Sequence, residues 1–427
     1  MLSPVKVIVV GAGSRGETYS DFASIHPDRL QVVGIADPRL FARKKLQECH
    51  NVPEENVFDD WHCIAEREKF ADAVFICTPD RLHKVCEISD HSYQYLTKWF
   101  FVTLEDCTEI AETCIQTGVI LAVCHVLQYD PFIRKIKVLI DSGAIGDVIH
   151  IQHFEPVGFY HFAHSFVRGN WRNEAESSFA LLAKSCHDLD LINHWAGKRR
   201  CIKVSSFGSL NHFQKENKPP GAASRCLDCS VETDCAYSAK KIYLDRVKKG
   251  WVRWPVSVVC RNSIPDIESV TEALKTGPYG RCVYECDNDV CSNQVVNMEF
   301  EGGLTASFSM VAFTEEICLR KTSIQGSKGE VTYDGHEIKV FDFLTQISTK
   351  HTVDLSVPGS FSKGGHGIAD YHLVDAFVSA VANGNPLMIQ SGPKETLASH
   401  RLVFEAERSR LENRVVMCYV TLPCDIA

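Results

Sequence analysis

Long apolar runs are missing from this sequence of 427 residues. The short apolar run near the start, residues 5–10, is shorter than the core of a signal peptide, and no stretch approaches the length of a membrane span. Basic residues are not in excess either, because the sequence has 45 Lys and Arg but 54 Asp and Glu. It also has no basic stripe with interleaved aromatic residues. We therefore expect a cytoplasmic protein that binds neither membranes nor nucleic acid.

Cysteine, in contrast, is abundant, with 19 residues. Without a signal peptide these are better interpreted as reduced thiols, some of them metal ligands, than as a disulfide framework. The length exceeds what one simple core accommodates, so we expect two domains. We place them at residues 1–130 and 131–427, with a cysteine-rich insertion at about 211–292.

A glycine motif follows the first apolar run. The β-branched residues Val5–Val10 favour a buried parallel strand, and Gly11, Gly13 and Gly16 then form Gly-x-Gly-x-x-Gly before a helix expected from Glu17. We expect Gly11 to make the turn, Gly13 to admit a pyrophosphate, and Gly16 to let the helix pack closely on the strand. The alternative is a glycine turn in an ordinary βαβ unit.

An acidic residue ends the next predicted strand, residues 30–36. Asp37 stands about twenty positions after the glycines, where a dinucleotide fold binds the adenosine ribose hydroxyls. Ser14 belongs to the same phosphate-binding turn, while Arg15 and Arg39 are close enough in sequence to neutralise a 2′-phosphate. The cofactor is therefore predicted as NAD or NADP.

Further βαβ units follow, with strands predicted at 71–77 and 119–124 and a helix at 103–117. This alternation predicts a doubly wound parallel sheet of α/β class. Ligands collect at the carboxyl ends of such strands, so Thr78, Pro79 and His83 are expected to border the cofactor.

The order of several motifs resembles the Gfo/Idh/MocA oxidoreductase family. The resemblance covers residues 5–400 and depends on the glycine motif, Ala36-Asp37-Pro38, Cys77-Thr78-Pro79-x-x-x-His83, Leu104-Glu105-Asp106-Cys107, Ser142–Val148 and Cys186–Leu191. It implies a Rossmann domain followed by an α+β domain with a large, open, mainly antiparallel sheet that often forms an oligomer interface. It also implies a homodimer or homotetramer, and hydride transfer between NAD(P) and a secondary hydroxyl of a sugar, inositol or related polyol. Strands predicted at 148–154, 295–300 and 304–310 agree with such a sheet.

The sequence departs from the family pattern at its catalytic lysine. Where the resemblance implies Glu-Lys-Pro, the chain has Thr97-Lys98-Trp99, and the preceding residues 84–96 lack the expected helix, glycine and strand. Lys98 is either the catalytic lysine in an altered setting or a solvated lysine.

A second group of catalytic candidates comes from a helix that we expect to begin near Leu181. Lys184, His187 and Asp188 recur on one face of this helix at three- and four-residue steps. The family carries an Asp four residues before this His, and here that position is Ala183, so Lys184 is predicted to act electrostatically in its place. The alternative for His187 is a buried structural histidine.

Upstream of this helix, residues 160–171 combine aromatic and polar side chains. We predict that His164, Arg168 and Trp171 contact the substrate together with Asp188, the alternative being an ordinary surface loop.

The insertion carries a Cys-x2-Cys-x5-Cys cluster formed by Cys226, Cys229 and Cys235. This spacing suits a structural tetrahedral zinc or an iron–sulfur cluster, with Cys286 or Cys282 as the fourth ligand. The alternative is a loop of free thiols.

These observations favour an NAD(P)-dependent oxidoreductase acting on a small sugar or polyol, in which Lys98, His187 and Lys184 handle the proton. The altered segment around Lys98 leaves open a catalytically impaired dinucleotide-binding sensor or scaffold. Glycoside cleavage by transient oxidation on the same scaffold is a third possibility.

Overall fold

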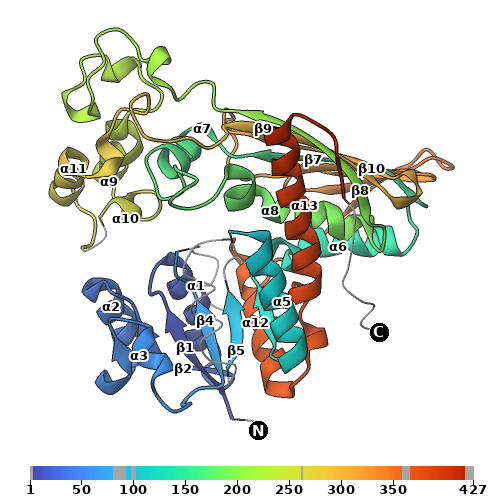
Figure 1. Cartoon of the computed structure of the whole chain (residues 1–427), viewed down its shortest axis with the longest axis horizontal. Coiled ribbons are helices and arrows are strands. Elements are labelled where there is room, and N and C mark those ends of the chain that lie inside the picture. The colour runs from blue at the N-terminus through green and yellow to red at the C-terminus, as the bar shows by residue number, and fades with distance from the viewer. Residues whose placement is uncertain (1–2, 80–92, 98–101, 261–262, 358–365, 419–427) are drawn as a thin grey trace. The chain divides into compact units, whose positions relative to one another are not determined.

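The computed structural model describes residues 3–79, 93–97, 102–260, 263–357 and 366–418. The chain forms two compact units (Figure 1). Unit 1 comprises Met1–Lys135, Val252–Ser269 and Val353–Ala398, and unit 2 comprises Ile136–Trp251, Val270–Thr352 and Ser399–Ala427.

Unit 1 is built on a parallel sheet of six strands in the order β3-β2-β1-β4-β5-β6. The strands are β1 (Val5–Val10), β2 (Leu30–Ala36), β3 (Val57–Phe58), β4 (Ala73–Ile76), β5 (Gln94–Thr97) and β6 (Leu121–Val123). Five of the six residues of β1 are buried, as a strand covered on both faces requires. The strand order reverses direction between β1 and β4, which confirms the predicted doubly wound α/β domain and marks where such sheets bind ligands.

The helices described in unit 1 follow the predicted alternation. They are α1 (Ser14–Ile25), α2 (Leu40–His50), α3 (His62–Ala65), α5 (Leu104–Thr117), α10 (Val256–Val259) and α12 (Ile368–Asn383). Helix α5 begins where the Thr103 hydroxyl accepts a hydrogen bond from the Asp106 amide, and it ends at Gly118 with a left-handed backbone.

Strand β5 corrects one expectation. Residues 84–96 were expected to lack a strand, yet Gln94–Thr97 pairs in parallel with both β4 and β6. The stretch is short, but Tyr95 and Leu96 supply buried side chains at the correct register between the two neighbouring strands. Residues 84–92 lie outside the described part of the chain.

Unit 2 is built on a sheet of nine strands in the order β14-β13-β12-β11-β7-β10-β9-β8-β15. The strands are β7 (Val148–Pro156), β8 (Cys201–Ser209), β9 (Asn293–Phe300), β10 (Thr305–Val311), β11 (Lys321–Gly326), β12 (Gly329–Tyr333), β13 (Ile338–Asp342), β14 (Ser348–His351) and β15 (Val416–Met417). The β7–β10 pair is parallel and the other pairs are antiparallel, which confirms the predicted large and mainly antiparallel sheet.

Helix α8 (Ala180–Ala196) covers this sheet at β7 and β10. Most of its residues are buried, and Trp195 is among the largest fully buried side chains. Along β7, Ile151, His153 and Glu155 alternate inward and are buried. Polar groups of β7 and α8 are therefore enclosed together.

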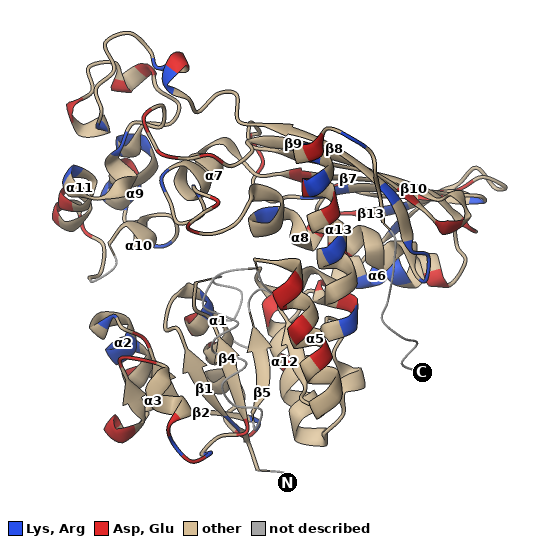
Figure 2. Ribbon diagram, in the orientation of Figure 1, with Lys and Arg blue, Asp and Glu red and all other residues tan. Residues whose placement is uncertain are grey.

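The remaining helices include α7 (Phe159–Phe162) and α9 (Asp245–Lys248) in unit 2. Helices α6 (Pro131–Asp141), α11 (Ile267–Thr276) and α13 (Pro393–Glu412) each continue from unit 1 into unit 2. Figure 2 shows acidic and basic residues mixed along α13, where Arg408 and Arg410 pair with Glu405 and Glu407. In the described part of the chain, every helix is too short or too polar to cross a membrane.

Candidate functional site

The loop after β1 requires glycine at two positions. Gly11 has a φ of +98°, and a Cβ atom there would lie 2.6 Å from the carbonyl carbon of Cys77. A Cβ atom on Gly16 would lie 2.1 Å from the carbonyl oxygen of Gly11. Gly13 differs, because a Cβ atom there would meet the flexible end of Arg39 at 3.3 Å. Gly11 and Gly16 are therefore needed by the fold, and Gly13 leaves the backbone bare.

Helix α1 begins at this bare backbone. Its N-cap is Gly13, which offers no side-chain acceptor to the first-turn N–H groups, including those of Ser14 and Arg15. Unsatisfied amides and the positive end of the helix dipole favour an anion here. The loop and helix together fit the diphosphate of a dinucleotide.

Asp37 ties the end of β2 to the glycine loop. Its Oδ2 accepts a hydrogen bond from the Ala12 amide at 2.8 Å, and the residue is 3 % exposed. The predicted ribose-binding carboxylate is thus fixed beside the glycines at the carboxyl edge of the sheet.

Arg39 occupies the remaining acceptor positions of Asp37. Its Nε and Nη2 donate to Oδ1 and Oδ2 of Asp37 at 2.9 and 2.7 Å, and its amide donates to Oδ1 at 2.8 Å. With the bond from Ala12, this fills about four acceptor sites of the carboxylate. Hydrogen bonding to Asp37 raises the pKa of Arg39, whose side chain is 40 % exposed. In this conformation Arg39, whose side chain is partly exposed, occupies the acceptor positions of Asp37 that a ribose diol would use.

Arg15, which was also predicted to lie close enough to neutralise a 2′-phosphate, has a fixed partner inside unit 1. Its Nη1 lies 3.0 Å from Oδ2 of the fully buried Asp370 on α12. Asp370 also accepts the His366 amide at 2.6 Å. This ion pair holds α12 against α1, where Phe22 packs on Tyr371 with ring centroids 5.4 Å apart.

The carboxyl edge of the sheet carries further predicted residues. Thr78 and Pro79 follow β4, and Thr78 lies in the loop against which Gly11 packs. His125 follows β6 and was not predicted; burial lowers its pKa to about 3, so it is neutral at pH 7. Lys98 and His83 lie outside the described residues.

In unit 2, Lys184 belongs to a buried ion network. Its Nζ lies 2.8 Å from Oε1 of Glu155 and 3.0 Å from Sγ of Cys318. Burial alone would lower the pKa of Lys184, but Cys318 and Glu155 outweigh it and raise the pKa above its usual value. Lys184 is therefore a fixed positive charge inside unit 2, and its electrostatic role in catalysis stays a prediction.

Asp188 anchors the other end of the network. Its Oδ1 accepts hydrogen bonds from Nε of Arg320 at 2.6 Å and Nε2 of His153 at 3.0 Å. Burial acts to raise the pKa of Asp188, yet Arg320 and His153 prevail and hold it at about 2. Arg320 also lies 3.2 Å from Glu155, so two carboxylates and two cations compensate one another in the interior.

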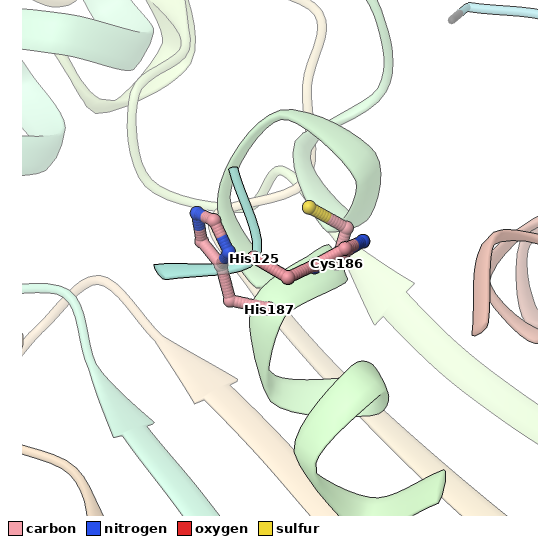
Figure 3. A group of neighbouring side chains, drawn as sticks. All are labelled: His125, Cys186 and His187. Atoms are coloured by element: carbon pink, nitrogen blue, oxygen red, sulfur yellow. The ribbon is translucent and has the colours of Figure 1, made fainter. Parts of the chain in front are cut away.

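His187 follows Cys186 on α8, and Figure 3 shows both side chains leaving successive positions of that helix. Glu155 and Arg320 link Lys184 to Asp188, which lie on the same face of α8. The catalytic role of His187 stays a prediction.

The other predicted substrate contacts face the insertion. The Nδ1 of His164 lies 2.8 Å from the Tyr243 hydroxyl, and its ring stacks on Tyr279 at 4.9 Å. Arg168 is 1 % exposed and contacts the cysteine-rich segment. Trp171 is half-buried beside Phe166. Their role as substrate contacts stays a prediction.

The structure gathers the predicted metal-binding cysteines. Cys226, Cys229 and Cys235 line one cavity together with Cys282. Cys286, the predicted fourth ligand with Cys282 as its alternative, is not part of that lining.

Sequence reasoning missed several partners in the network of unit 2. His153 and Glu155 fall on the inward positions of a strand that was predicted, so the alternation of β7 could have identified them. Arg320 and Cys318 precede β11 and carry no local signal.

Both parts of the chain are similar in sequence to known protein families. Residues 5–125 match the oxidoreductase family described as NAD-binding Rossmann fold, and residues 137–417 match its C-terminal alpha/beta domain. The oxidoreductase YteT of Bacillus subtilis (strain 168) is 25% identical over 399 residues, which cover 86% of this chain and 87% of YteT.

An inositol 2-dehydrogenase from Pseudomonas savastanoi pv. phaseolicola (strain 1448A / Race 6) is 28% identical over 158 residues, 36% of this chain and 46% of that enzyme. Among solved structures, an oxidoreductase from Agrobacterium radiobacter in complex with NAD+, L-tartaric acid and magnesium has a TM-score of 0.69 at 14% identity, covering 97% of this chain and 98% of that chain. Both domain matches together span most of the sequence, and the chain belongs to the Gfo/Idh/MocA oxidoreductase family.

Proposed function

We propose that this protein is an NAD-dependent oxidoreductase that transfers a hydride between the nicotinamide and a secondary hydroxyl of a sugar, inositol or related polyol. The observation that carries the proposal is the Asp37 carboxylate, held by the Ala12 amide next to Gly11 and Gly13. A carboxylate in this position accepts ribose hydroxyls and repels a 2′-phosphate, which favours NAD over NADP.

In this proposal unit 1 holds the cofactor. The first-turn amides of α1 would hold the diphosphate, and Asp37 would hold the adenosine ribose in place of its present contact with Arg39. When bound, the nicotinamide ring supplies the acceptor for the hydride.

Unit 2 supplies the polar groups for the substrate. Lys184 is held charged by Glu155, so it stabilises negative charge that develops on the substrate oxygen rather than transferring a proton itself. His187 is our candidate for the group that takes the hydroxyl proton, together with Lys98.

A polyol is the substrate class that the relatives favour, because an inositol 2-dehydrogenase is among them. The full chain, incubated with NAD and a panel of inositols, sugars and sugar acids, is expected to generate reduced nicotinamide with at least one of them. His187→Ala should lose turnover while it keeps its affinity for NAD. A protein that binds NAD but reduces none with any compound of the panel would instead be the sensor or scaffold.

We also propose that the protein forms a homo-oligomer through the open sheet of unit 2. Phe207 on β8 and Val295 on β9 are cross-strand neighbours and are both exposed, Phe207 by 64 %. An exposed apolar pair on a broad sheet is suited to burial against a second copy. Light scattering should show a dimer or tetramer for the wild-type chain and a smaller species for Phe207→Lys.

A further inference from the structure

Two segments of the insertion that are far apart in sequence are held together by backbone contacts. Arg225 and Arg281 form an isolated antiparallel bridge, and the Cys282 amide donates to the Ser224 carbonyl at 2.8 Å. This pairing places Cys226 and Cys282 next to the bridge, one residue after it on each of the two antiparallel segments.

Four cysteines surround a small cavity beside this bridge. Cys226, Cys229, Cys235 and Cys282 line a cavity of about 20 Å³, which is large enough for a single ion or water molecule. Cys286 lies outside this lining, and its thiol donates to the Cys282 carbonyl at 3.2 Å. The cavity thus has four sulfur donors, the number that a structural zinc site uses.

A buried positive charge faces the same cavity. The guanidinium of Arg168 lines it and is 1 % exposed, with Nε and Nη2 donating to the Arg281 and Tyr237 carbonyls at 2.8 Å and Nη2 lying 3.4 Å from the Cys226 sulfur. Its Nη1 makes no hydrogen bond of normal geometry within the described residues.

No carboxylate of the described residues forms an ion pair with this guanidinium. Among the described residues none lies within 4.0 Å of Arg168, and Glu232, the acidic residue lining the cavity, is engaged by Ser238 and Lys240. A buried cation without an anion is costly. The buried guanidinium therefore favours an anionic group in this cavity.

We propose that Cys226, Cys229, Cys235 and Cys282 bind one structural Zn²⁺ ion. Binding forms four Zn–S bonds and releases the four thiol protons to solvent. The resulting site carries a net charge of −2, and Arg168 neutralises one of these two negative charges. No three of these four cysteine sulfur atoms lie within 4.8 Å of one another in the structure. Zinc binding therefore requires the cysteine side chains to rotate toward the cavity, so that each sulfur reaches the Zn–S distance of about 2.3 Å.

Such a site is structural because four thiolates leave no open coordination position for substrate. Its effect is to fasten the segment around Cys226 to the segment around Cys282. Arg168 then links this metal-bound insertion to the end of the helical segment that begins at Phe159.

The test is the metal content of the full chain, purified anaerobically after expression with added zinc. Elemental analysis should find one zinc per chain, and Co²⁺ exchanged into the site should give the intense visible bands of tetrahedral thiolate coordination. Zinc below about a tenth of an equivalent, iron with acid-labile sulfide, or a disulfide among these cysteines would each overturn the proposal.

Single variants test the choice of ligands. Cys226→Ser and Cys282→Ser should lose zinc, whereas the matched control Cys286→Ser, four residues from Cys282, should retain it. Retention by Cys282→Ser with loss by Cys286→Ser would refute the assigned set. If the Ser variants fail to fold, the Co²⁺ spectrum of the wild-type chain still decides the number of thiolates. Titration with NAD is independent of this result and tests the proposed function separately.

Arg168 gives a second readout. Arg168→Met should weaken zinc binding about 10- to 100-fold, as loss of a group that supports metal ligands does, and Arg168→Lys should restore part of it. Equal zinc affinity in the wild type and Arg168→Met would contradict the charge compensation.

Discussion

Arg39 holds both carboxylate oxygens of Asp37 with its side chain, at 2.7 and 2.9 Å, in the position where a dinucleotide fold binds ribose hydroxyls. The same arginine offers a positive charge to a 2′-phosphate at this position. We therefore expect Arg39 to compete with NAD for Asp37 and to assist the binding of NADP.

Removing this side chain should increase the preference for NAD. In Arg39→Ala we expect unchanged or tighter NAD binding and roughly 10- to 100-fold weaker NADP binding, because one charge-assisted hydrogen bond contributes about 1.5–3 kcal/mol. Dissociation constants from calorimetry provide the measurement. Lys45→Ala is the control. It also removes one positive charge from α2, but Lys45 pairs with the exposed Glu17 and not with Asp37. Equal losses of NAD and NADP in Arg39→Ala would refute the competition.

The glycines of the loop should separate into structural and binding roles. Gly16→Ala places a methyl group against the Gly11 carbonyl oxygen and should cost about 1–3 kcal/mol or more of unfolding free energy. Gly13→Ala meets only the movable end of Arg39, so it should fold normally yet bind NAD more weakly. Denaturant unfolding and NAD titration of both variants give the comparison. A Gly13→Ala protein with wild-type NAD affinity would argue against a diphosphate at this loop.

These outcomes also indicate what the sequence could reveal. The β-branched run before Gly11, Asp37 at the end of β2, and the Thr103 cap of α5 are local signals, and the structure has each element where the pattern predicts it. Strand β5 was missed because four residues show too little periodicity, and its pairing with β4 and β6 decides its structure.

Contacts between distant residues could not be predicted. Asp370 is 355 residues from Arg15 in the sequence, and no local sequence pattern around either residue indicates the ion pair. The helical spacing of Lys184 and Asp188 did predict that they share a face. The groups that make this face a charge network, Glu155 and Arg320, are brought there by the pairing of β7 with β11.

The network around Asp188 should be intolerant of single substitutions. Arg320→Met leaves Asp188 and Glu155 buried without that cation, so we expect a loss of about 3–5 kcal/mol of unfolding free energy. Adding Asp188→Asn should recover part of this loss, because the remaining buried charge is smaller. A double-mutant cycle by denaturant unfolding measures the coupling, and additive losses would show that the two residues do not interact.

Stability should depend on pH through His164. Burial, followed by the charges of Arg168 and Arg246, lowers the pKa of His164 from 6.5 to about 3. The unfolded state therefore takes up this proton as the pH falls below 6.5 while the folded state stays neutral, so stability is lost from pH 6.5 down to about 3.

Between pH 7 and 5 this loss is about 2 kcal/mol, at 1.36 kcal/mol per pKa unit. His164→Phe keeps a ring against Tyr279 and removes the titrating group. Between pH 7 and 5 the unfolding free energy of this variant should therefore fall by about 2 kcal/mol less than that of the wild type. Denaturant unfolding at both pH values is the measurement, and parallel pH curves for the two proteins would exclude His164 as the source.

The most direct test of the account is calorimetric titration of the full chain with NAD, compared with Asp37→Ala. We predict measurable heat and a raised Tm for the wild type, and about 10- to 100-fold weaker binding for Asp37→Ala. No heat and no change in Tm with the wild type, or equal affinity in Asp37→Ala, would contradict the dinucleotide site.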